Sequence, residues 1–130
     1  MDQMRAAIHH EHGGREVLRI EKISVPAIED DEIQVEVKAC CLNHLDVFCR
    51  LGMPGMPIPL PHIAGGDVAG VVSQIGKNVE NIQVGDRVLL DPHFVQNGKP
   101  FTFGETTWGG LCEYAKIPAE NAIPLPDDVT

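Results

Sequence analysis

The segment "CCLNHLDVF" (residues 40–48) places three polar side chains in an apolar run. Asn43, His44 and Asp46 stand among leucine, valine and phenylalanine residues. Imidazole and carboxylate groups bind zinc or transfer protons, and a carboxamide both donates and accepts hydrogen bonds. The pattern therefore indicates a metal site, a catalytic site without metal, or a set of residues that cap a turn.

The four cysteines do not form a recognisable framework. Cys40, Cys41, Cys49 and Cys112 contain no C-x-x-C pair, so we expect free thiols in a reducing compartment. Cys41 lies near His44 in sequence, which allows a catalytic pair. A buried thiol that packs as a small apolar group is the more common role.

Three histidines, His9, His10 and His12, lie near the N-terminus. On a strand His10 and His12 would share a face and bind adventitious metal. Three histidines without a fourth ligand are more typical of a solvated hairpin. We therefore expect this segment at the surface.

Composition and charge narrow the class of protein. The chain has 130 residues, enough for one domain with its own core, and a formal net charge of −9. This acidity argues against nucleic acid and membranes as partners, since both attract clustered lysine and arginine. No apolar run has the length of a bilayer span or a signal peptide. We expect a cytoplasmic protein.

Hydrophobic periodicity predicts mainly strands. The segments with alternating or continuous apolar residues between glycine turns are 33–39, 68–75, 85–90 and 111–117. Residues 6–23 are typical of a hairpin that turns at Gly13-Gly14.

Other segments are irregular or weakly helical. Residues 43–51 and the tail after Pro126 are the only helix candidates. Residues 91–110 are polar and rich in glycine, which predicts a long connection of the kind that often carries function. Phe94 and Trp108, within it, border a substrate cleft or pack in the domain.

Two glycine-bearing segments do not match nucleotide-binding motifs. "GGDVAG" (65–70) has aspartate where G-x-G-x-x-G needs glycine, and it enters a strand instead of opening a helix. "GVVSQIGKN" (70–78) has the wrong spacing for a P-loop and lacks its Ser or Thr. Neither segment predicts a phosphate site.

Five segments, in order, resemble one family. They are "HGGREVLRIEKISVP", "DEIQVEVKACCLNHLDVFCRLG", "PLPHIAGGDVAGVVSQIGKNV", "VGDRVLL" and "WGGLCEYAKIPAENAIPLPDDV". The chain resembles the N-terminal GroES-like domain of the medium-chain dehydrogenase/reductase superfamily. The resemblance implies a mainly β, partly open barrel with short helices over residues 1–130, and a Rossmann cofactor domain that these residues do not contain.

The resemblance also bears on zinc. In the zinc alcohol dehydrogenases of this family, a cysteine ligand stands at the position of Asn43, and the histidine of a Gly-His-Glu motif stands at that of Gly66. The four cysteines that hold a structural zinc have no counterpart in residues 91–110. We therefore expect no zinc. Asn43 and Asp67 place the chain nearer the zinc-free quinone oxidoreductases.

The family implies roles for the polar cluster. Asn43, His44 and Asp46 are the candidate catalytic residues, and Asn43 and Asp46 are expected near the nicotinamide and its ribose. His44 is either a cleft or proton-relay residue or a hydrogen-bonded turn residue.

A second group of residues is expected to shape a turn. Gly65, Gly66 and Gly70 would allow backbone conformations or close packing that side chains forbid. Asp67 is expected to accept backbone N–H bonds from this turn.

The function implied is the substrate side of an NAD(P)H-dependent oxidoreductase that reduces quinones or enones. A zinc-dependent alcohol dehydrogenase and a non-catalytic GroES-like binding module are the alternatives. The complete enzyme is expected to bind a small carbonyl or quinone and to form a homo-oligomer. The isolated chain is expected to be inactive, because it lacks the site for the dinucleotide.

Overall fold

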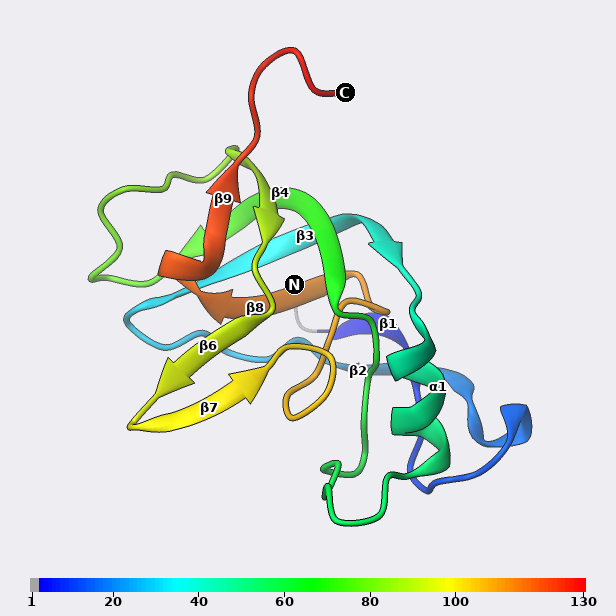
Figure 1. The fold of residues 1–130 in the computed structure, drawn as a ribbon. Helices are drawn as coiled ribbons and strands as arrows, with labels where there is room; N and C mark the ends of the chain where they lie inside the picture. Colours follow the sequence, from blue (N-terminus) through cyan, green and yellow to red (C-terminus); the bar gives the residue numbers. More distant parts are fainter. Residues whose placement is uncertain (1–2) are drawn as a thin grey trace.

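A five-stranded antiparallel sheet forms the centre of the computed structural model, which describes residues 3–130 (Figure 1). In spatial order its strands are β8 (Tyr114–Pro118), β3 (Glu32–Cys41), β4 (Asp67–Ile75), β5 (Arg87–Leu90) and β9 (Ala122–Pro124). The two 3₁₀ turns are η1 (Arg15–Val17) and η2 (Ala119–Asn121). Two further hairpins complete a mainly β, GroES-like fold, as the sequence predicted.

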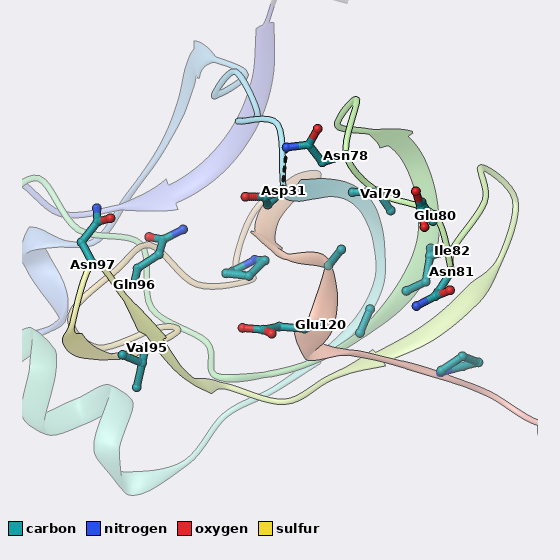
Figure 2. A pocket seen from close by; sticks show the side chains of 14 residues that line it. Asp31, Asn78, Val79, Glu80, Asn81, Ile82, Val95, Gln96, Asn97 and Glu120 are labelled. Carbon is teal, nitrogen blue, oxygen red and sulfur yellow. Dashed lines mark hydrogen bonds between the residues drawn. The ribbon is translucent and has the colours of Figure 1, made fainter.

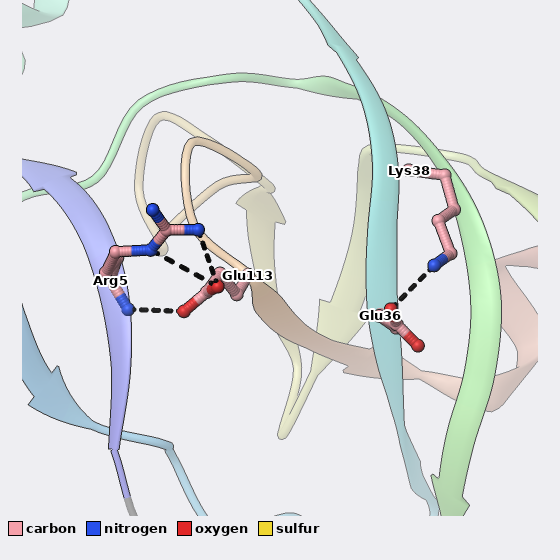
Figure 3. Close-up of polar contacts among 4 residues, drawn as sticks. All are labelled: Arg5, Glu36, Lys38 and Glu113. Atoms are coloured by element: carbon pink, nitrogen blue, oxygen red, sulfur yellow. Dashed lines mark hydrogen bonds and ion pairs between the residues drawn. The ribbon is translucent and has the colours of Figure 1, made fainter.

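The hairpin of β1 (Gln3–Ile8) and β2 (Arg19–Ser24) adjoins the central sheet near β8. An isolated β-bridge joins Ala6 to Cys112. The Glu113 carboxylate accepts the Arg5 backbone N–H at 2.7 Å and its guanidinium at 3.0 Å (Figure 3). These bonds lower the pKa of the Glu113 carboxyl, the backbone N–H being the largest cause. They tie the β1–β2 hairpin to the residue that precedes β8.

The core lies between the central sheet and the segments that cover it. Val35, Val72 and Val88, from three neighbouring strands, are at most 1% exposed. The alternation of buried and exposed residues along β4 and β5 puts one face of the sheet in this core. Gly70 lies where β3 and β4 approach closely: a Cβ there would collide with the Glu36 carbonyl and stand 2.6 Å from Val35 Cγ1.

Strands are present in all four segments where periodicity predicted them. β3, β4 and β5 match their predicted ranges to within a few residues. β8 starts at Tyr114, later than the predicted residue 111, because Leu111 and Cys112 contact β1 instead of β3.

Three other predictions need correction. The first hairpin does not turn tightly at Gly13-Gly14: ten residues separate β1 from β2, and the 3₁₀ turn η1 lies between them. Residues 91–110 are not only a loop, because they contain a hairpin of β6 (His93–Gln96) and β7 (Lys99–Thr102). The tail after Pro126 forms a turn and no helix.

The predicted helix at 43–51 is present as α1 (His44–Leu51). Of its residues only Cys49 is fully buried, while Phe48 and Leu51 are each 52% exposed. Figure 1 shows α1 at one side of the molecule, well separated from the β6–β7 hairpin. Within residues 3–130 no helix is long and apolar enough to span a bilayer.

Candidate functional site

The polar cluster of the opening segment lies at the N-terminus of α1. Asn43 is the N-cap residue, with extended backbone angles, and the helix starts at His44. The Asp46 Oδ2 atom accepts the Asn43 backbone N–H at 2.7 Å. This is one half of a capping box, in which a side chain of the first turn satisfies a backbone donor ahead of the helix. Of the three roles that the sequence allows for this segment, Asp46 thus has the capping one, and its catalytic role stays a prediction.

Asp46 also fixes the glycine-rich turn before β4. Its other oxygen, Oδ1, accepts the Gly65 backbone N–H at 2.9 Å. Gly65 has a φ of +102°, and a Cβ there would stand 2.6 Å from the Cys40 sulfur. A glycine is therefore required at this position by both conformation and packing. One carboxylate thus holds together the helix start and the turn.

Asn43 and Asp67 are joined by their side chains. The Asn43 Nδ2 atom donates to Asp67 Oδ2 at 2.7 Å. Both side chains are exposed, and they come from the start of α1 and the start of β4. The sequence predicts that Asp67 accepts backbone N–H bonds of the turn. The structure corrects this assignment, because Asp46 accepts the Gly65 N–H and Asp67 accepts the Asn43 amide.

His44 stands apart from this network. It is exposed and makes no side-chain hydrogen bond among residues 3–130. The hydrogen-bonded turn role is thus wrong for this conformation, and the cleft role stays a prediction. Cys41 is exposed and forms no bond with His44, so the structure does not bring the two together as a pair.

The other two glycines, Gly66 and Gly70, differ in how closely other atoms surround the position of a Cβ. Gly70 is needed for close packing of β3 and β4, as described above. Gly66 has no positive φ, and a Cβ there would meet only the Phe103 carbonyl oxygen, at 3.3 Å. The packing at Gly66 is therefore tighter than an ordinary contact, but less restrictive than at Gly65 and Gly70.

The described residues do not form a zinc site. In residues 3–130 no group of three or more His, Cys, Asp or Glu side chains is arranged to hold a metal ion. Asn43 donates its amide to a carboxylate, and Gly66 has no side chain, so two of the family's ligand positions do not fit the metal. The absence of zinc itself stays a prediction.

The structure contains a pair of buried histidines that no sequence pattern indicated. His9 and His62 form a β-bridge, and they are 1% and 0% exposed. Their rings meet edge to face with centroids 5.5 Å apart. This corrects the expectation that His9 lies in a solvated hairpin. Of the three histidines near the N-terminus, His10 and His12 are exposed and His9 is buried. Nothing in the local sequence signals the pair, because the partners are far apart in the chain.

Hydrogen bonds to backbone carbonyls fix the tautomers of His9 and His62. His9 Nδ1 lies 3.1 Å from the Glu11 carbonyl oxygen, and His62 Nε2 lies 3.0 Å from that of Gly104. Because a carbonyl only accepts, these two nitrogens carry the protons. His9 Nε2 and His62 Nδ1 are then bare acceptors, buried and without a partner in the described chain. Burial lowers the pKa of both rings.

Three hollows of the surface lie away from the Asn43 cluster. One, of about 670 Å³, is lined by polar and apolar residues of the segments 78–82 and 95–97, with Asp31 and Glu120 (Figure 2). Asn43, Asp46 and Asp67 line none of these three hollows. The cluster is an open surface, which suits one wall of a cleft better than a complete pocket.

The chain matches the model of the alcohol dehydrogenase GroES-like domain over residues 29–127. It belongs to this family, the N-terminal domain of medium-chain dehydrogenases/reductases. The family assignment made from the five sequence segments is confirmed.

Curated relatives include proteins of both branches. A quinone oxidoreductase of Salmonella typhimurium is 36% identical over 121 residues, which cover 93% of this chain and 33% of the relative. A zinc-type alcohol dehydrogenase-like protein of Schizosaccharomyces pombe is 31% identical and covers 98% of this chain and 39% of its own length. The chain therefore spans between a third and two fifths of these relatives.

A solved structure with the same fold is that of an NAD-dependent alcohol dehydrogenase. It superposes with a TM-score of 0.88 at 34% sequence identity, over 98% of this chain and 41% of its own. The chain is thus the GroES-like domain of an oxidoreductase family, and the rest of its relatives' length has no counterpart in these 130 residues.

Proposed function

We propose that these residues form the substrate-side wall of an NAD(P)H-dependent reductase for quinones or enones that works without zinc. The observation that supports this most directly is the bond from Asn43 to Asp67. A carboxamide held by a carboxylate stands where a zinc enzyme of the family would place its metal ligands. The 36% identity to a quinone oxidoreductase points to the same branch.

Asn43 is the residue proposed to contact the reacting groups. With one N–H committed to Asp67, its second N–H remains to donate to a substrate carbonyl or to the oxygen of the nicotinamide amide. Hydrogen bonds supply the polarisation that zinc would otherwise give, and quinones need less of it than simple ketones.

Asp46 is proposed to position the site and not to touch the cofactor. Both of its oxygens already accept backbone N–H groups, from Asn43 and Gly65. NAD(P)H supplies the hydride when bound. These residues offer no glycine-rich turn at the start of a helix for its pyrophosphate, so that contact belongs to a further domain of a complete enzyme.

A zinc-dependent alcohol dehydrogenase is the second candidate. It is favoured by the 31% identity to a zinc-type relative. The two candidates differ in metal content and in the direction of the reaction they support.

The test uses the natural protein that contains these residues, purified without chelator. We expect oxidation of NADPH or NADH with 1,4-naphthoquinone, less than about 0.1 zinc per chain, and no loss of rate with a chelator such as dipicolinate. About one tightly bound zinc per chain, together with chelator-sensitive oxidation of a primary alcohol, would replace the first candidate by the second. A protein with neither activity would favour a binding module.

A further inference from the structure

A second cavity lies between the edge strand β8 and the β6–β7 hairpin. Its volume is about 280 Å³. Its walls come from parts of the chain that are far apart in sequence: the start of β1, the segment before β3, the hairpin, residues 107–109 and β8. Such a cavity depends on the whole fold and not on the shape of a single loop.

The lining of this cavity is mainly apolar and aromatic. Phe94, Trp108 and Tyr114 contribute rings, and Met4 and Pro26 contribute aliphatic groups. Phe94 is held in place by stacking on Phe101, with centroids 5.5 Å apart. Pockets for small organic ligands have this composition, with a few polar groups that fix the orientation of the ligand.

Polar side chains of the lining, Gln96 and Tyr114 among them, keep free hydrogen-bonding capacity. Gln96 and Tyr114 make no side-chain hydrogen bond among residues 3–130. Lys116 donates to the Ala27 carbonyl at 3.3 Å and to the Glu32 carboxylate at 3.4 Å. The Gln96 amide and the Tyr114 hydroxyl are therefore available to donate to a ligand oxygen.

The charges of the lining argue for a neutral ligand. Lys116 and Glu32 form an ion pair, so their charges compensate each other. The chain as a whole carries −9, which disfavours an organic anion, and the aromatic walls disfavour a strongly hydrated sugar. A flat, neutral, aromatic molecule with one carbonyl or similar acceptor matches the cavity in size, polarity and charge.

We propose that this cavity is a binding site for a small neutral aromatic carbonyl compound, separate from the Asn43 cluster. The separation follows from the lining, which contains none of Asn43, Asp46 and Asp67. The proposal does not depend on the proposed function, because it concerns binding to this domain and no hydride transfer.

Trp108 makes the site directly observable. It is the one tryptophan of the chain, and its indole N–H donates to the Pro61 carbonyl at 2.8 Å. A ¹H–¹⁵N spectrum of the 130-residue chain therefore contains a single indole N–H signal, which reports on the wall of the cavity. Titration with acetophenone is expected to shift this signal in a saturable way, with half-saturation on the order of 1 mM.

Variants within the same hairpin supply the controls. Phe94→Ala removes one aromatic wall and is expected to weaken binding about three- to tenfold. Val95→Ala changes the neighbouring residue, which is 62% exposed and outside this lining, and should leave the half-saturation unchanged. Asn43→Ala should also leave it unchanged, which separates this site from the proposed reductase site.

Several outcomes would overturn the proposal. They are a linear, non-saturating shift, an equal half-saturation in Phe94→Ala, and a shift that disappears in Asn43→Ala. A dispersed backbone spectrum in each variant shows that the fold is intact. If Phe94→Ala does not fold, Gln96→Ala replaces it, because Gln96 lines the cavity without belonging to the apolar core. Benzoate, which carries a charge, is expected to bind at least about fivefold more weakly than acetophenone.

Discussion

The side chains of Asn43 and Asp67 meet across the start of α1 and the start of β4, with Nδ2 and Oδ2 2.7 Å apart. Because an ionised carboxylate only accepts, this contact fixes which end of the Asn43 amide faces Asp67. The Asn43 carbonyl oxygen is therefore directed away from Asp67. A side chain whose orientation is fixed by its neighbour is preorganised to bind a polar group.

Replacement of Asn43 by alanine in the natural protein is expected to lower kcat/KM for quinone reduction by roughly ten- to a thousandfold. Asp67→Asn is expected to cause a smaller loss, because an Asn–Asn pair allows either orientation of the amide. Steady-state rates with 1,4-naphthoquinone measure both. Asn78→Ala is the matched control, since Asn78 forms a similar exposed pair with Asp31 away from this cluster. Equal rates for Asn43→Ala and wild type would place the site elsewhere.

The sequence predicted the central strands because their apolar pattern is local. It missed the β6–β7 hairpin, although a signal was present: Asn97 and Gly98, with φ of +52° and +74°, form its two-residue turn. Asn-Gly favours this turn type, and the polarity of the surrounding residues concealed it. For a hairpin of short strands, the turn residues are therefore a better predictor than the polarity of the strands.

The candidate site was predicted in part. The polar types of Asn43 and Asp46 showed that the segment was special, and the family resemblance placed it at a cleft. The partners of these side chains, Asp67 and Gly65, depend on how α1 meets β4, which no local pattern specifies. The His9–His62 pair was missed for the same reason.

Gly70→Ala is expected to destabilise the domain by about 2–3 kcal/mol, because the new Cβ would overlap the Glu36 carbonyl and press on Val35. Gly66→Ala, four residues earlier in the same segment, should cost less than about 1 kcal/mol, since its Cβ meets a single atom at 3.3 Å. Urea unfolding followed by circular dichroism measures both. Similar losses in the two variants would mean that the strands do not approach as closely as described.

Alkylation should separate the cysteines by accessibility. Burial raises the pKa of Cys49 to about 11 and that of Cys112 to about 12. At pH 8 about one Cys49 side chain in a thousand is then a thiolate, the form that reacts. Cys41 is exposed, so iodoacetamide in the native state should modify it first. Mass spectrometry of peptides after short exposure measures the order. Rapid modification of Cys49 in folded protein would contradict its burial.

Acid should destabilise the fold through His9 and His62. Burial is the main cause that lowers the pKa of both rings, and for His9 the nearby His12 and Arg50 lower it further. The ordinary pKa of histidine is 6.5. Below that pH the two imidazoles bind more protons in the unfolded chain than in the native protein, where their pKa is lower. The free energy of unfolding therefore falls as pH is lowered through 6.5. The contribution of the two neutral histidines to this free energy is fully present only above that pH.

His62→Gln tests this origin of the pH dependence, because glutamine can still donate to the Gly104 carbonyl but cannot ionise. We expect the loss of unfolding free energy between pH 7.5 and 5.5 to shrink by roughly half, since one of two buried rings no longer titrates. His44→Gln is the matched control, because His44 is exposed and without a hydrogen-bonding partner in the described chain. Urea titrations at the two pH values measure the difference. An unchanged pH dependence in His62→Gln, or an equal change in His44→Gln, would show that other groups control the acid sensitivity.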